Sequence, residues 1–181
     1  AVTVGTADAA VDLTTIGGTA ISSVTVTDDV TFTGTLHGTV QTAVDGGFTL
    51  TTSAAKATGK TIVDGSGPAT TAITALDDTV TANLGNIATT TVTAAVGLSD
   101  ETVTFTGDLG KAAVTITGVN GNADDIFNVD GATMGTATFS VGADAILQGT
   151  AAKLSGVTAT GVGTTAITAL DDTVTANLGN I

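Results

Sequence analysis

The chain of 181 residues has no cysteine, tryptophan, tyrosine or arginine, and it has only one proline and one methionine. Without cysteine there is no disulfide framework and no thiolate site, so cysteine usage does not identify a redox compartment. Without large aromatic side chains, the core has to be built mainly from Val, Ile, Leu and Ala. These residues and the abundant threonine are small or β-branched and favour a pleated strand, so we expect an all-β fold.

Basic residues are also scarce, because four lysines stand against 17 acidic residues and the net charge is −13. Phosphate recognition needs clustered Lys and Arg, which argues against nucleic acid or an anionic membrane surface as a partner. No apolar run reaches the roughly 18 residues that span a bilayer, so we expect no membrane insertion. Cations are the plausible small partners, although the same acidity also suits a solvated, repulsive surface.

The strongest pattern is an exact duplication: the block TTAITALDDTVTANLGNI occupies residues 70–87 and again residues 164–181. Self-similarity of this length indicates a repeat architecture. We divide the chain into a unit of residues 1–87 and a unit of residues 88–181, each ending in the block. The chain begins at Ala1 without an initiator Met, from which we expect a mature product or a segment of a longer array.

A shorter echo, VTFTGTL at residues 30–36 and VTFTGDL at residues 103–109, lies at a different offset from the block. Segments about as long as one strand-turn-strand therefore occupy different positions in the two units. A solenoid tolerates such changes, because each coil touches only its neighbours. We expect an all-β repeat protein, a β-solenoid, and the alternative is two tandem immunoglobulin-like β-sandwiches.

Alternation of apolar and polar residues predicts half-buried strands between turns rich in Gly and Asp. The predicted strands are residues 23–27, 30–35, 48–52, 79–84, 102–106, 114–117, 136–141 and 173–178. Residues 6–13 and 73–76 have a helical pattern. One or two helical turns are unstable alone in water, so we expect caps or corners there.

No group of residues in the sequence predicts an enzyme. His37 is the only histidine, and no serine or cysteine nucleophile stands next to it, so we interpret it as a polar residue near a turn. Four Asp-Asp pairs leave a glycosidase-like pair of carboxylates open by residue type alone. Carbohydrate-cleaving sites usually add aromatic platforms, and this chain has neither Trp nor Tyr. We therefore predict no catalytic residues.

One segment suggests an ion site. VNGNADDIFNVDG, residues 119–131, resembles one nonapeptide of the repeat-in-toxin calcium roll, with Asp125 at the ligand position and Phe127 at the core position. Two of the glycines are replaced, and no second nonapeptide lies beside it, so an ordinary turn rich in Asn and Asp is the alternative. The candidate calcium ligands are Asn122, Asp124, Asp125 and Asp130. The sequence requires no cofactor, and calcium is the ion that it suggests.

Thr-x-Thr pairs recur along the chain and resemble the flat threonine ladders of ice-binding solenoids. The gaps between successive pairs vary widely, whereas a regular plane needs coils of constant length. Ice binding is therefore a remote alternative, and the simpler interpretation is that threonine is the polar residue most compatible with strands.

The composition, the acidity, the exact repeat and the toxin-roll-like turn together resemble large repetitive bacterial surface proteins: surface-layer proteins, giant adhesins and extracellular filament subunits. The resemblance implies secretion, calcium-supported rigidity and a structural or adhesive role. We predict a structural protein of the cell exterior, a subunit or segment of an extracellular fibre, stalk or surface coat that forms a homo-oligomer or polymer. The alternative is a spacer of a large bacterial adhesin whose binding domain lies elsewhere.

Assembly should involve the repeat junctions, because both units end in the same block. We expect end-to-end contacts with copies of the same chain or with adjacent repeats. The predicted junction residues are Asp77, Asp78, Ile87, Ala88, Asp171, Asp172, Ile181 and Ala1.

Overall fold

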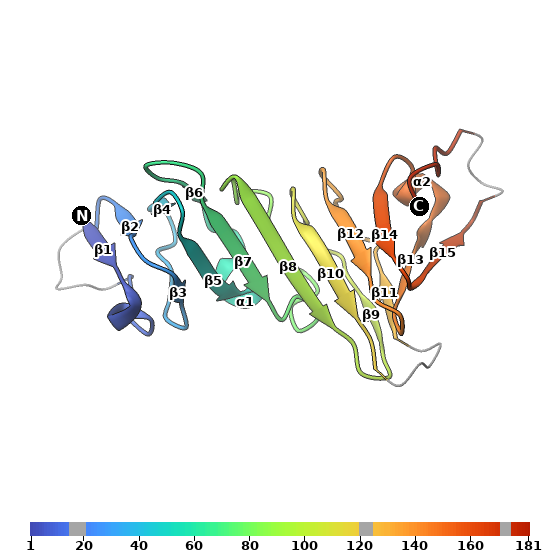
Figure 1. Cartoon of the computed structure of the whole chain (residues 1–181), viewed down its shortest axis with the longest axis horizontal. Coiled ribbons are helices and arrows are strands. Elements are labelled where there is room, and N and C mark those ends of the chain that lie inside the picture. The colour runs from blue at the N-terminus through green and yellow to red at the C-terminus, as the bar shows by residue number, and fades with distance from the viewer. Residues whose placement is uncertain (15–20, 120–124, 171–174) are drawn as a thin grey trace.

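The chain folds into an elongated β-solenoid of about eight turns, with its two termini toward opposite ends of the long axis (Figure 1). This computed structural model describes residues 1–14, 21–119, 125–170 and 175–181. The strand pairings among the described residues are parallel. The predicted β-solenoid is confirmed. The alternative of immunoglobulin-like sandwiches is wrong, because those are built from antiparallel sheets.

Three parallel sheets run along the solenoid. The N-terminal sheet contains β1 (Val2–Val4), β2 (Val24–Val26), β4 (Thr42–Val44) and β6 (Ile62–Asp64), in that order. The central sheet contains β3 (Val30–Thr31), β5 (Thr49–Ser53), β7 (Thr70–Thr74), β8 (Thr91–Gly97), β10 (Ala113–Thr117), β12 (Thr138–Val141) and β14 (Thr158–Gly161). The C-terminal sheet contains β9 (Thr102–Thr104), β11 (Ile126–Asn128), β13 (Ile146–Thr150) and β15 (Thr164–Thr168).

Period-two alternation places aliphatic side chains inside each coil and threonine outside. In β8, Val92, Ala94 and Val96 are buried, while the residues between them face solvent. Three short helical turns occur between strands: η1 (Thr6–Asp8), α1 (Ala54–Ala57) and α2 (Ala151–Leu154). The core is a single column of mostly small side chains along the solenoid axis.

The third side of each coil is a tight corner, which the chain reaches once per turn. The side chains of Asn83 and Asp108 accept hydrogen bonds from the amides of Gly85 and Gly110, at 3.1 and 2.8 Å, and so close an Asx turn. Backbone bridges and hydrogen bonds join neighbouring corners. The corner residues are Asp12, Thr35, Thr58, Asn83, Asp108, Thr133, Ser155 and Asn177. They stand 22 to 25 residues apart, which is the length of one coil.

The eight corners form two sets of four. The corner dipeptides are Asp-Leu, Thr-Leu, Thr-Gly and Asn-Leu in the first set, then Asp-Leu, Thr-Met, Ser-Gly and Asn-Leu in the second. Helices α1 and α2 precede the third corner of each set. We number the coils one to eight by the corner that ends each. Coils four and eight contain the exact block, so the solenoid repeats every four coils.

Equivalent strands of the two sets lie in different sheets. Each complete coil has a first and a second strand before its corner. In the early coils these strands belong to the N-terminal and central sheets, and in the late coils they belong to the central and C-terminal sheets. The chain changes from one pair of sheets to the other in coil five. There Ile87 forms a bridge with Ile62 of the N-terminal sheet, and the following strands β8 and β9 lie in the central and C-terminal sheets. Strand β7 pairs with β8 across residue 87, so the solenoid is continuous there and the proposed unit boundary stays a prediction.

Three local predictions are wrong. Of the predicted strand at residues 173–178, the described residues 175–178 form a turn and irregular chain. Residues 79–84 alternate like a strand but form turns and the fourth corner. Residues 73–76 end strand β7 instead of forming a helix, because Ala75 has a left-handed φ of 53°. The sequence analysis also missed α1 and α2, which read AAKA and AAKL and consist of strong helix formers.

The corners require small residues, and Gly107 offers a test. A Cβ at Gly107 would lie 2.0 Å from the carbonyl oxygen of Ala82 in the preceding coil, so Gly107→Ala must displace the backbone. We expect Gly107→Ala to lower the free energy of unfolding by about 1–3 kcal/mol or more. Gly97→Ala is the control, because nothing lies within 4 Å of the added carbon. Chemical denaturation of both variants checks this, and equal stability would contradict the close approach of the coils.

Candidate functional site

The predicted junction around residues 87 and 88 is a packed contact between coils four and five. Strand β7 pairs in register with β8. The Leu76 amide donates to the Ala95 carbonyl at 3.1 Å, and the carboxylate of Asp77 accepts from the Gly97 amide at 3.1 Å. The Thr89 hydroxyl donates to the Thr71 hydroxyl at 2.9 Å, and both residues are fully buried. Coil five therefore packs over the first copy of the block and also forms hydrogen bonds with it.

Asp64 fastens the start of coil five to the loop after β6. Its carboxylate accepts hydrogen bonds from the hydroxyl and the amide of Thr90 at 2.7 and 2.8 Å, and from the amide of Ala69 at 3.0 Å. The bonds from Thr90 hold the pKa of Asp64 below its ordinary value, and the bond from Ala69 and the charge of Lys111 act in the same direction. The sequence analysis did not identify Asp64, which lies outside the duplicated block.

The second copy of the block has the same sequence but a different environment. Leu76 and Ile87 in the first copy are 0% and 2% exposed, whereas Leu170 and Ile181 in the second copy are 55% and 38% exposed. Among the remaining predicted junction residues, Asp78, Ala88 and Ala1 are exposed. Asp171 and Asp172 lie outside the described residues. The structure therefore buries one copy of the block and leaves the end of the other copy open.

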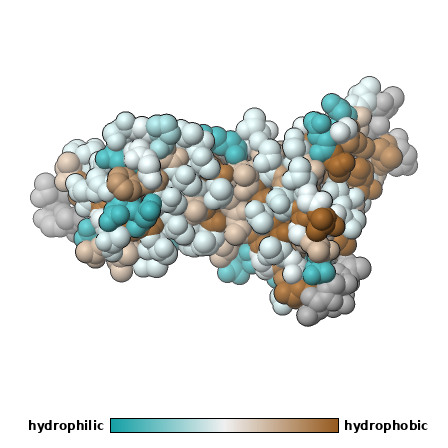
Figure 2. All heavy atoms as spheres, in the orientation of Figure 1, coloured by the Kyte–Doolittle hydropathy of each residue, from teal (hydrophilic) through white to brown (hydrophobic). Residues whose placement is uncertain are grey.

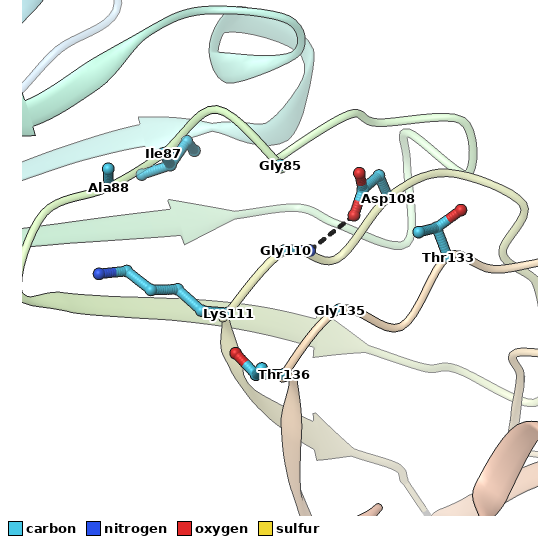
Figure 3. Close-up of a pocket in the computed structure, with 9 residues that line it drawn as sticks. All are labelled: Gly85, Ile87, Ala88, Asp108, Gly110, Lys111, Thr133, Gly135 and Thr136. Carbon is cyan, nitrogen blue, oxygen red and sulfur yellow. Dashed lines mark hydrogen bonds between the residues drawn. The ribbon is translucent and has the colours of Figure 1, made fainter.

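A shallow groove of about 400 Å³ starts at this junction and crosses the corners of coils four to six (Figure 3). Gly85, Gly110 and Gly135 each follow a corner by two residues, and their missing side chains form its floor. Both Gly110 and Gly135 have positive φ, which explains why glycine suits these positions. Asp108 and Lys111 lie apart along the groove, and Thr136 lies on its wall (Figure 3).

The chemistry of the groove follows from the corners. Asp108 accepts the amide of Gly110 as part of its turn, so the turn itself explains this carboxylate. The lining contains no imidazole and no thiol. The polar side chains of the lining supply one ammonium, one carboxylate and two threonine hydroxyls. A shallow groove with these groups suits a weak contact with a polar chain better than it suits enclosure of a small molecule.

The structure describes only part of the predicted calcium site. Asn122 and Asp124 lie outside the described residues. Asp125 is fully buried, and its two carboxylate oxygens accept the amides of Asp100 and Val119, each at 2.6 Å. Asp130 accepts the amide of Thr150 in the next coil. Both aspartates therefore join loops of neighbouring segments, and calcium binding stays a prediction.

His37 lies just after the second corner. Its Nδ1 atom accepts hydrogen bonds from the amides of Thr39 and Val40 at 3.1 and 2.9 Å. The imidazole therefore closes a turn, in agreement with its interpretation as a polar residue near a turn. Within the described residues, no three His, Cys, Asp or Glu side chains gather in a way that could hold a metal ion.

The outer face of the central sheet is a second candidate site, and we call it the threonine face. Register places Thr51, Ala72, Thr93, Ala113, Thr138 and Thr158 in one row. A second row contains Ala95, Thr115, Ser140 and Thr160. The outward positions of strands β5 to β14 in this sheet contain only Thr, Ser, Ala and Gly, although the chain is strongly acidic. Figure 2 shows mostly pale surface over these strands.

The threonine face corrects one step of the sequence analysis. Unequal gaps between Thr-x-Thr pairs argued against a regular plane. The coils do differ in length, but the differences fall in the loops, and the strands remain in register. The missed signal was the corner dipeptide, a small polar residue followed by leucine, methionine or glycine, which recurs once per coil and in the same order in both sets of four.

The pH dependence of stability tests the role of Asp64. Because its folded pKa is depressed, Asp64 stabilises the fold above its unfolded pKa of about 3.9, and this contribution disappears as the pH falls through the folded pKa. We expect Asp64→Asn to lower the melting temperature at neutral pH and to match the wild type at strongly acidic pH. Asp78→Asn is the control, because Asp78 is an exposed carboxylate in the first copy of the block. An Asp64→Asn effect that persists undiminished in acid would contradict this role.

Comparisons with known proteins identify no family. No family model matches the chain, and no curated protein and no solved structure is detectably similar. No helix in the described parts of the chain has the length and apolarity to cross a membrane. The function therefore has to be argued from the geometry.

Proposed function

We propose that this chain is a structural protein of the cell exterior, a segment or subunit of a fibre, stalk or surface coat. The observation that carries the proposal is a continuous stack of parallel coils with an exact repeat, in which the next coil covers the first copy of the block through the pairing of β7 with β8. In such a stack each coil contacts only its neighbours, so a long array can be built from similar coils. This architecture suits a rod.

The composition supports an exterior role. The chain has no cysteine, so its coils are held together without disulfides, and a net charge of −13 keeps crowded copies soluble. The resemblance to large repetitive bacterial surface proteins points the same way. Calcium bound near Asp125 and Asp130, which lie just before and just after β11, is part of this proposal, as an ion that stiffens the rod. A spacer of a large adhesin uses the same rod with a recognition domain elsewhere.

Assembly tests this proposal. We expect the purified chain to form rods or end-to-end oligomers whose mean length increases with protein concentration. Light scattering and negative-stain electron microscopy measure this, with calcium and with a chelator. Calcium should lengthen the rods or raise their melting temperature, and Asp125→Ala should remove that effect. A monomer at every soluble concentration, in both conditions, would contradict an assembling structural role.

The threonine face favours ice binding as a second candidate function. Neighbouring strands lie about 4.8 Å apart and alternate residues within a strand about 6.6 Å apart, so the face is a two-dimensional lattice of methyl and hydroxyl groups. A periodic lattice suits a crystalline surface better than a single flexible molecule. Stacking a second sheet on this face would remove many hydroxyls from water without large apolar side chains in compensation. An ordered water lattice leaves those hydroxyls hydrogen-bonded.

Ice shaping and recrystallisation inhibition test this second function. We expect the wild-type chain to slow recrystallisation, and we expect Thr93→Lys and Thr115→Lys to abolish the effect, because each places a long charged side chain in the middle of the threonine face. Thr104→Lys is the control, since Thr104 is an exposed strand residue of the C-terminal sheet. Absence of activity in the wild type, or equal activity in all variants, would contradict ice binding.

A further inference from the structure

We infer that the open edge of strand β9 (Thr102–Thr104) binds an extended, positively charged segment of a partner protein, which adds a strand to the C-terminal sheet. The edge belongs to coil five, in the interior of the stack, so it does not depend on how the solenoid continues at either end. The inference goes beyond the proposed function, because it identifies a place where the rod holds another protein.

Coil five is wider than coil four on this side of the solenoid. Strand β8 continues past the end of its pairing with β7 and reaches Gly97 (Figure 1). The Gly97 amide donates to the carboxylate of Asp77 at 3.1 Å, and the Thr106 amide donates to the carbonyl of Val80 at 2.7 Å. Coil four spans the distance between these two bonds with a tight turn, whereas coil five inserts residues 98–105. The inserted residues therefore project beyond coil four and begin the C-terminal sheet.

The backbone of β9 is bonded to a strand on one side only. The Phe105 amide donates to the carbonyl of Asn128 at 2.8 Å, at the end of the pairing with β11. Successive backbone groups of a strand point to opposite sides, so Thr102 and Thr104 direct their amides and carbonyls away from β11. The Thr106 amide points the same way and is satisfied by coil four. In the described part of the chain, no backbone hydrogen bond reaches the amides and carbonyls of Thr102 and Thr104.

The core is also partly open along this edge. Val103, the inward residue of β9, is 7% exposed, whereas its neighbour Phe127 in β11 is fully buried. Val80 is 37% exposed and lies beside Thr106 at one end of the edge. An added strand places every second side chain inward, next to Val103, and so extends the core. The edge therefore suits a strand with aliphatic residues at alternate positions.

Acidic side chains around the edge determine the charge of the partner. Exposed Asp100 and Glu101 precede β9, and exposed Asp78 lies in the turn of coil four beside it. The lysines of the chain lie near corners, at Lys56, Lys60, Lys111 and Lys153. A second copy that paired its own β9 with this edge would bring like charges together, whereas lysine or arginine in the added strand neutralises them. The charge therefore favours a cationic partner over another copy.

Binding of this kind is strand addition, in which main-chain hydrogen bonds provide affinity and side chains provide specificity. Thr102 and Thr104 offer their amides and carbonyls to the added strand. A short edge with charged neighbours resists pairing with unselected strands. The acidic residues therefore act as a filter, and a segment that carries positive charge passes it.

A peptide titration followed by amide exchange tests the site. The probe is the synthetic peptide Thr-Lys-Val-Thr-Val-Lys-Thr, blocked at both ends, and its control has glutamate in place of both lysines. In the free chain, we expect the amides of Thr102 and Thr104 to exchange faster than those of Val103 and Phe105, which bond to β11. Saturation with the lysine peptide should slow the Thr102 and Thr104 amides by about tenfold or more, and the glutamate peptide should bind about tenfold more weakly. Nuclear magnetic resonance measures both quantities.

A backbone variant separates strand pairing from charge attraction. Thr104→Pro removes an amide that points away from β11, so the pairing with β11 is retained while the edge is blocked. We expect the lysine peptide to bind this variant about tenfold or more weakly. Thr104→Val is the matched control, because it changes the side chain and keeps the amide, and it should bind like the wild type. Slow exchange of the Val103 and Phe105 amides confirms that β9 is folded in both variants.

Two modified peptides test the same bonds from the side of the partner, should Thr104→Pro fail to fold. One is N-methylated at both valines and the other at the central threonine. Alternate amides of an added strand face the edge, so only one of the two modified peptides should bind the wild-type chain. Equal binding of both peptides overturns strand addition.

The remaining outcomes are equally decisive. Slowed exchange confined to β9, loss of binding in Thr104→Pro and preference for the lysine peptide support the inference. Unchanged exchange in the presence of peptide, equal binding of the lysine and glutamate peptides, or undiminished binding to Thr104→Pro overturns it. Protection of Thr102 and Thr104 in the free chain that increases with protein concentration shows that a second copy covers the edge, which overturns the cationic partner. Rod assembly is measured separately, so failure of this inference leaves the proposed function standing.

Discussion

Each coil has to return to a corner where the backbones of neighbouring coils almost touch, and the other features of the solenoid depend on this approach. At the corner of coil five, the Asp108 amide donates to Ala82 at 2.9 Å, and no side chain fits at Gly107 between the two backbones. A small residue therefore precedes this corner. Asp108 closes its own turn by accepting the amide of Gly110, and Leu109 after it is buried in the core. One short local pattern thus sets the pitch of the coil, and the loops elsewhere are free to vary.

The unusual composition follows from parallel coils with a narrow interior. Strands such as β8 turn aliphatic side chains inward and small polar side chains outward, and most of the few phenylalanines are buried in the core, where the rings of Phe105 and Phe127 pack with their centroids 5.8 Å apart. The described carboxylates lie at corners, in loops or at the ends of short elements, as Asp64 does at the end of β6. There they accept backbone amides, as Asp64 does from Thr90 and Asp125 does from Asp100. The acidic charge therefore lies at the rims of the sheets, and the central sheet keeps an uncharged outer face.

The sequence was sufficient to predict the class of fold, because alternation, small residues and moved segments all indicate stacked coils. It was insufficient for the alignment of those coils. The echo VTFTG compares coil two with coil five, whereas the corner dipeptides show that coil five corresponds to coil one. Ile87 was named because the block ends there, and a unit boundary at that residue stays a prediction. Asp64 and Thr89 were missed, because hydrogen bonds between coils join residues 18 to 26 positions apart and leave no local pattern.

The two copies of the block separate what is local in this fold from what a neighbour provides. Ala75 and Ala169 share a left-handed backbone, and Asn83 and Asn177 close the same turn, so the eighteen residues determine their own path. Their burial differs, because only the first copy has a coil on its far side. Stability in such a stack is the sum of each coil and its contacts with adjacent coils, so every added coil that covers the previous one adds an interface term.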